Sequence, residues 1–150
     1  MHKELPKFLA KLKVRGFKVK LDTNGFFPQI LSECLMYTDY VAMDVKTCRG
    51  KYPLLGAPDT ADMIKSMELL KNGEVPYEFR TTVVPDLFTP QDAHLIGEMI
   101  KGTQTYVLQQ FIPEDTLGKH YKTVKPYTPE EIDELAKIIS PYTEKIILRI

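Results

Sequence analysis

The sequence has only two cysteines, Cys34 and Cys48, among its 150 residues. Two are too few for a disulfide scaffold, and a structural zinc site needs four ligands, usually in closely spaced pairs. We interpret Cys34 as a small buried residue on a helix, because free cysteine is among the residue types most often buried. Cys48 is predicted to lie in a loop, and its role stays open.

An excess of charge of one sign is also absent, since 20 Lys and Arg side chains balance 20 Asp and Glu side chains. A chain without surplus positive charge gives no support to nucleic-acid binding. The sequence lacks any run near the roughly 18 apolar residues of a membrane span, and lysines interrupt its first 17 residues too often for a signal peptide. We therefore expect a soluble, cytoplasmic protein with neither a nucleic acid nor a membrane as partner.

The length and the hydrophobic content bound the number of domains. A chain of 150 residues that is 43% hydrophobic can bury one sizeable core and is too short for two ordinary domains. We expect a single domain that spans residues 1–150.

Stretches with strand character alternate along the chain with stretches in which apolar residues recur at helical spacing. The predicted strands are 17–21, 40–44, 77–84, 106–111 and 145–150, and helical patterns begin near Leu5, Pro28, Thr60, Pro90 and Pro129. The segment 45–58 is too irregular to predict an element, and a long loop is predicted up to Tyr127. Five strands that alternate with amphipathic helices indicate an α/β fold with parallel strands and right-handed crossovers, in an open sheet or a barrel.

Polar residues gather where the predicted strands end, which is where ligands bind in such folds. Asp22 and Thr23 end the first strand, Asp44 and Lys46 follow the second, and Arg80 lies in the third. Each has an ordinary structural explanation, since turns and surface ion pairs use the same residue types. The combination favours a ligand, because a cation beside a carboxylate can bind a zwitterion: the cation takes its carboxylate, and oxygens of Asp or Thr take an amine, a hydroxyl or a bound cation.

Five stretches follow one another along the chain in a distinctive order: LDTNG at 21–25, MDVK at 43–46, FRTTVVP at 79–85, LGKHYK at 117–122 and VKPYTPEE at 124–131. Together they resemble the radical S-adenosylmethionine (SAM) activating enzymes, which include the activases of pyruvate formate-lyase and of anaerobic ribonucleoside-triphosphate reductase. The resemblance covers essentially the whole chain and implies a partial (β/α) barrel of about five mostly parallel strands with flanking helices. It also implies that Asp22, Thr23, Asp44, Lys46 and Arg80 bind SAM and a monovalent cation beside it.

In that family a CxxxCxxC loop holds a [4Fe–4S] cluster, and reductive cleavage of SAM leads to hydrogen abstraction from a glycine of a partner enzyme. This sequence lacks the loop, and Cys34 and Cys48 have the wrong number and spacing to replace it. We therefore expect the C-terminal portion of an activase, a truncated radical SAM barrel without its N-terminal cluster-binding part, with no metal ligand and no catalytic residue of its own. It should be inactive alone. The implied partner is a glycyl-radical enzyme of the anaerobic ribonucleotide reductase or pyruvate formate-lyase type.

Other functions stay open. The chain could be a non-catalytic module that binds SAM, a nucleotide or another protein. An aldolase-like enzyme would need Lys46 as a Schiff-base nucleophile, but Asp44 beside it favours the charged ammonium. The contact to the adenine of SAM is left unassigned, because the nearest histidine, His120, comes late in the loop. An unpaired first strand and an apolar patch beside it would favour self-association.

Overall fold

The structure is a computed structural model that describes residues 2–116 and 118–150. Its five strands form one sheet in the order β1-β2-β3-β4-β5, and each strand pairs in parallel with the next. They are β1 (Lys20–Thr23), β2 (Tyr40–Asp44), β3 (Tyr77–Thr82), β4 (Thr103–Gln109) and β5 (Thr143–Arg149). Right-handed crossovers that all pass over the same face produce this sequential order. The predicted α/β fold with five parallel strands is therefore confirmed.

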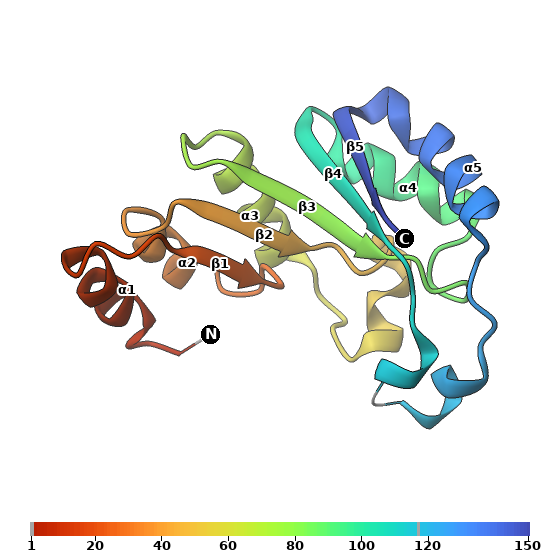
Figure 1. Cartoon of the computed structure of the whole chain (residues 1–150), viewed down its shortest axis with the longest axis horizontal. Helices are drawn as coiled ribbons and strands as arrows, with labels where there is room; N and C mark the ends of the chain where they lie inside the picture. The colour runs from red at the N-terminus through yellow and green to blue at the C-terminus, as the bar shows by residue number, and fades with distance from the viewer. Residues whose placement is uncertain (1, 117) are drawn as a thin grey trace.

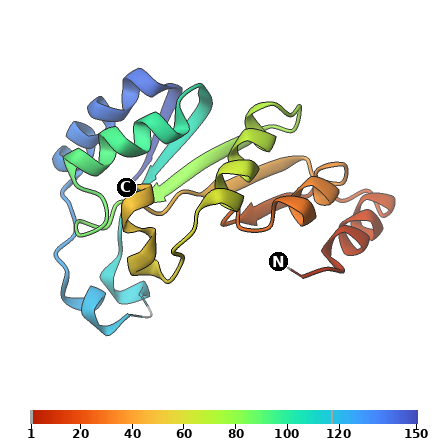
Figure 2. The same ribbon diagram turned by 180° about the vertical axis from the view of Figure 1, so that it is seen from behind.

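Helices cover one face of this sheet. They are α1 (Leu5–Val14), α2 (Pro28–Leu35), α3 (Ala61–Lys71), α4 (Pro90–Ile100) and α5 (Pro129–Ile139). In Figure 1 the strands lie in front of α2 to α5, and in Figure 2 these helices lie in front of the strands. Helix α1 lies at the β1 end of the sheet, far from α5 (Figure 1). The face that carries none of the helices described here is called the open face below.

The hydrophobic core lies between the sheet and the helices. Its fully buried members include Val41, Met43, Phe79, Tyr106 and Leu108 from the strands, and Leu31, Met67, Ile96 and Ile132 from the helices. Burying each such side chain stabilises the fold by roughly 2 kcal/mol relative to leaving it in water. Cys34 on α2 belongs to this core with 0% of its surface exposed, which confirms the prediction of a buried helical cysteine.

Two helices begin at the capping signals that the sequence shows. Thr89 accepts a hydrogen bond from the N–H of Asp92, and the carboxylate of Asp92 accepts one from the N–H of Thr89. Thr128 and Glu131 make the same reciprocal pair at the start of α5. Each pair satisfies N–H groups that the first helical turn leaves without partners, so α4 and α5 start where a threonine precedes a proline.

Besides shifts of one to three residues at the ends of β3, β4 and β5, the structure differs from the predicted elements in three places. The segment 45–58 contains a 3-10 helix, η1 (Arg49–Leu55), so the prediction of no element there was wrong. Tyr52 anchors this helix in the core with 2% of its surface exposed. The loop before Tyr127 contains two further 3-10 helices, η2 (Pro113–Asp115) and η3 (Lys119–Thr123), while Leu117 of the LGKHYK stretch lies outside the described residues.

The third difference is the start of the first strand, which begins at Lys20 instead of residue 17. The backbone of Val19 pairs with Asp39: its N–H donates to the Asp39 carboxylate at 2.7 Å, and its C=O accepts the Asp39 N–H at 2.8 Å. These bonds use the groups that would otherwise extend the ladder. Among residues 2–116 and 118–150, no helix combines the length and the hydropathy needed to cross a membrane.

Candidate functional site

The open face carries a row of charged side chains at the carboxyl ends of the first three strands. Asp44 on β2 and Arg80 on β3 are register partners, and Asp22 on β1 is the partner of Ala42, two residues before Asp44. Because alternate residues of a strand point to opposite faces, Asp22, Asp44 and Arg80 share one face, and Lys20 shares it too. The residues between them, such as Met43 and Phe79, point into the core.

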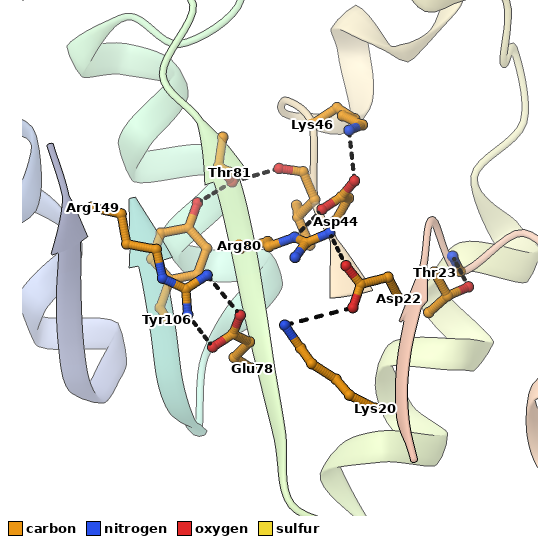
Figure 3. Close-up of polar contacts among 12 residues, drawn as sticks. Lys20, Asp22, Thr23, Asp44, Lys46, Glu78, Arg80, Thr81, Tyr106 and Arg149 are labelled. Atoms are coloured by element: carbon orange, nitrogen blue, oxygen red, sulfur yellow. Dashed lines mark hydrogen bonds and ion pairs between the residues drawn. The ribbon is translucent and has the colours of Figure 1, made fainter. Parts of the chain in front are cut away.

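Hydrogen bonds and one longer ion pair join these side chains into one group, which we call the charged cluster: Lys20, Asp22, Asp44, Lys46 and Arg80. Arg80 donates through Nε to Oδ1 of Asp44 and through Nη2 to Oδ2 of Asp22 at 2.9 Å (Figure 3). Lys46 donates through Nζ to the other oxygen of Asp44 at 2.7 Å. The Nζ of Lys20 lies 3.6 Å from Oδ1 of Asp22. Two carboxylates thus alternate with three cations across neighbouring strands.

Burial differs across the cluster. The Arg80 and Asp44 side chains are 17% and 23% exposed, whereas Asp22 and Lys46 are 53% and 48% exposed. Burial of Asp44 favours its neutral form, but hydrogen bonds from Lys46 and Arg80 outweigh burial and hold the pKa of that carboxyl below its usual value. Asp44 is therefore an anion near neutral pH. Asp22 and Lys46 keep solvent-facing atoms that a ligand can reach.

Thr23 was also predicted as a site residue, but it does not belong to the charged cluster. It lies next to Asp22 on the strand and so points to the opposite face, where it is 8% exposed. Its hydroxyl accepts the N–H of Gly25 at 3.1 Å. Gly25 has a φ of 79°, and a Cβ there would lie 2.1 Å from Cε of Met43, so the turn requires glycine. The side chain of Thr23 therefore shapes the turn after β1.

A cavity of about 800 Å³ opens beside Lys46 at the carboxyl ends of β3 and β4. Thr82 and Val84 line it from β3 and the residues that follow, and Phe111, Ile112 and Tyr121 line it from the loop after β4. Small-molecule sites are commonly of this size and mostly apolar. Lys46 lines the cavity and also belongs to the charged cluster, so the two features adjoin. Sequence reasoning missed the cavity because its walls are irregular loops, which hydrophobic periodicity does not describe.

A second polar network lies on the open face around Glu78, whose side chain is 3% exposed. Arg149 on β5 donates to the two oxygens of Glu78 at 3.0 and 2.8 Å, and the hydroxyl of Tyr40 donates at 3.0 Å (Figure 3). Burial together with the Glu78 carboxylate raises the pKa of Tyr40 to about 12. The network connects β5 to β3 across β4, and no local pattern predicts it because its two main members lie 71 positions apart.

The residues described do not fit an iron–sulfur cluster. Within them no three His, Cys, Asp or Glu side chains are grouped so that they could hold a metal ion. Cys34 and Cys48 are both buried, and burial raises the pKa of each thiol, as do the carboxylates of Glu33 near Cys34 and Asp92 near Cys48. Cluster ligands must be thiolates, so these two cysteines have the wrong protonation as well as the wrong number.

Known proteins resemble this chain in sequence and in fold, although no family model matches it. It is 33% identical over 145 residues to a protein assigned as a glycyl-radical enzyme activating enzyme in Methanocaldococcus jannaschii. The match covers 91% of this chain and 60% of the relative, so the chain spans about three fifths of that protein's length. Its fold matches the crystal structure of a domain of pyruvate-formate lyase-activating enzyme from Bacteroides vulgatus with a TM-score of 0.77 at 12% identity, covering 99% of this chain and 94% of that one.

The parallel sheet with helices on one face is a partial (β/α) barrel, the fold that the pyruvate-formate lyase-activating enzyme domain shares. The chain is similar in sequence to a glycyl-radical enzyme activating enzyme and in fold to a domain of a pyruvate-formate lyase-activating enzyme. The resemblance seen in its sequence is thus confirmed.

Proposed function

We propose that this chain is the SAM-binding portion of a radical SAM activase that acts on a glycyl-radical enzyme. The observation that carries the proposal is that Asp22, Asp44, Lys46 and Arg80 meet on one face of three neighbouring strands, beside a cavity. The proposed parent reaction is hydrogen abstraction from a glycine of an anaerobic ribonucleotide reductase or a formate-lyase. SAM, when bound and reductively cleaved, supplies the group that takes this hydrogen.

The charges of the cluster complement those of the amino-acid part of SAM, which carries a carboxylate and an ammonium. The ammonium of Lys46 is half exposed and can donate to a ligand carboxylate while it stays paired with Asp44. The carboxylate of Asp22 is half exposed and can accept from a ligand ammonium. Arg80 is less exposed and bonded to both carboxylates, so its role is to hold them in fixed directions.

We assign the nucleoside part of SAM to the neighbouring cavity. Phe111, Ile112 and Tyr121 offer apolar and aromatic surface on which a purine ring can pack. A volume of about 800 Å³ leaves room for such a group next to Lys46. In this arrangement the ligand lies across the strand ends, with its charged end at the cluster.

The reductive step itself is not assigned to these residues. The thiolates that hold a [4Fe–4S] cluster would have to come from outside the 150 residues, since Cys34 and Cys48 do not fit that role. We propose that residues 1–150 act as one domain that binds and orients SAM and does not cleave it alone. The residues then have three tasks: to pair with the charges of SAM, to orient it and to enclose its nucleoside.

Isothermal titration calorimetry with SAM tests the proposal. We expect the full chain to bind SAM, and Lys46→Ala and Arg80→Ala each to weaken binding at least tenfold, which corresponds to about 1.4 kcal/mol. Lys137→Ala is the control, because Lys137 forms an exposed ion pair on α5, away from the site. Equal affinity in all four proteins would place SAM elsewhere. No binding to the wild type would reject the SAM assignment and leave a protein-interaction module.

A further inference from the structure

The peptide unit between Val45 and Lys46 lies just beyond the end of β2. The N–H of Val45 still donates to the C=O of Arg80 at 2.9 Å, as in the ladder. The C=O and N–H groups of the next peptide unit, Val45–Lys46, form hydrogen bonds with side chains instead. The hydroxyl of Thr81 donates to the C=O of Val45, and the N–H of Lys46 donates to the hydroxyl of Tyr52 at 3.0 Å. Side-chain hydroxyls thus replace the sheet where the chain turns from Asp44 to Lys46.

A third hydroxyl belongs to the same arrangement, since the oxygens of Thr81 and Tyr106 lie within hydrogen-bond distance (Figure 3). The direction of this bond follows from a count of protons. A threonine hydroxyl has one hydrogen, and that of Thr81 goes to the C=O of Val45, which can only accept. Tyr106 must therefore donate to Thr81, which gives a directed chain from Tyr106 through Thr81 to the backbone of Val45.

All three hydroxyl residues are closed off from water. Tyr52, Thr81 and Tyr106 have 2%, 1% and 0% of their surface exposed. Burial raises the pKa of Tyr52 to about 12 and that of Tyr106 well above its usual value, so both hydroxyls are protonated near neutral pH. Hydrogen bonds in such surroundings are shielded from solvent, and losing a partner is costly there.

We infer that Tyr52, Thr81 and Tyr106 are positioning residues that fix the Val45–Lys46 peptide and thereby direct the ammonium of Lys46 back onto Asp44. The inference relies on the proposed function only for what Lys46 binds; the contacts stand without it. Because Asp44 and Lys46 are separated by a single residue, rotating this peptide would turn Lys46 away from Asp44 and from the cavity that Lys46 lines.

A merely structural role is the competing explanation, since any buried peptide needs hydrogen-bond partners. The two roles differ in what they do to the site. A structural role changes the overall free energy of unfolding and leaves the ion pair between Lys46 and Asp44 intact in the folded state. A positioning role changes the local protection of the Lys46 amide and the titration of the Asp44 carboxyl while the fold persists.

The experiment uses the full chain with Tyr52→Phe, Thr81→Val and Thr81→Ser. Tyr127→Phe is the matched control, because the hydroxyl of Tyr127 also bonds to backbone, at the C=O of Phe88. NMR measures hydrogen exchange of the Lys46 amide against that of Val41, whose N–H donates within the sheet to Pro76, and follows the Asp44 carboxyl with pH. A SAM titration is the third measurement.

We expect the Lys46 amide to exchange at least tenfold faster in Tyr52→Phe, while the exchange rate of the Val41 amide is unchanged. We also expect the Asp44 carboxyl to titrate with a midpoint at higher pH in Tyr52→Phe and Thr81→Val. Thr81→Ser keeps the hydroxyl and should behave as the wild type, as should Tyr127→Phe. SAM affinity should fall at least threefold in Tyr52→Phe and Thr81→Val. If Lys46 exchange and Asp44 titration in both variants match Tyr127→Phe, the positioning role is overturned. If the wild type fails to bind SAM, the proposed function fails, and the two NMR measurements still decide the positioning role.

Discussion

Arg80 and Asp44 lie opposite each other in the register of β3 and β2, and the same guanidinium that bonds to Asp44 also bonds to Asp22 on β1. One side chain therefore connects three parallel strands at their carboxyl ends. A guanidinium is planar, always charged and a donor in several fixed directions, which suits it to hold two carboxylates apart at set angles. The cluster is thus arranged before any ligand arrives.

Asp44 should make the fold sensitive to acid. Its pKa is lower in the folded chain than in the unfolded chain, where the pKa of an aspartate is about 3.9. The stabilisation is therefore fully present above the unfolded pKa and is lost as the pH falls through the folded pKa. In Asp44→Asn we expect the free energy of unfolding to fall less steeply with acidity below about pH 4. Urea unfolding at a series of pH values measures this, with Asp133→Asn on the exposed side of α5 as control; the same slope in all three proteins would contradict it.

Arg149→Met should destabilise the protein by about 3 kcal/mol, because it leaves the carboxylate of Glu78 buried without its cation. The hydroxyl of Tyr40 remains as a partner but carries no charge. Lys137→Met removes an exposed ion pair and should cost less than about 0.5 kcal/mol. Urea unfolding of both variants provides the comparison, and a loss below about 1 kcal/mol in Arg149→Met would contradict this role of the ion pair.

The chain as it stands should not cleave SAM after incubation with iron, sulfide and dithionite. The expectation follows from its two buried thiols, which cannot replace three thiolate ligands. Chromatography for the cleavage products is the measurement, with an activase that has its own cluster loop as positive control. Product formed by this chain above the level of a protein-free mixture would refute the assignment of the reductive step to residues outside it.

The β1 end of the sheet should support self-association. β1 is an edge strand, and Phe8, Val14 and Phe17 beside it are 56%, 90% and 57% exposed. Unpaired strand edges and apolar surface both favour pairing with a second copy. Light scattering across micromolar concentrations should show a mass that rises with concentration, and Val14→Lys should shift it towards the monomer. A strictly monomeric wild type would rule this out.

Much of the fold could be predicted from sequence because its signals are local. The apolar run within 40–44 and the Thr-Pro signals at Thr89 and Thr128 depend on neighbouring residues, and the structure follows them closely. The 3-10 helix at Arg49–Leu55 escaped prediction because burial of Tyr52, a tertiary contact, stabilises it. The early start predicted for the first strand failed for the same reason, since Asp39 takes the backbone groups of Val19.

Most residues of the candidate site could be predicted from the sequence, but their orientations and contacts could be predicted less well. Asp22, Asp44, Lys46 and Arg80 follow from the rule that parallel strands present their carboxyl ends at one edge. Thr23 follows Asp22 directly in β1, so strand alternation turns it to the core face, whereas the resemblance to the family had grouped it with Asp22. The bridge from Arg149 to Glu78 joins residues 71 positions apart, so it could be found only in three dimensions.

The alternation on the first three strands also separates two sets of positions with different roles. Even-numbered positions such as Asp22, Asp44 and Arg80 meet the solvent side, whereas odd-numbered positions such as Met43 and Phe79 meet the helices. An exposed even position such as Asp22 can change what the protein recognises with little effect on packing, whereas a buried even position such as Glu78 also affects stability, as do the odd positions packed against the helices. The recognition side of this sheet can therefore vary most freely at its exposed positions, while its helix-facing side is constrained by the core.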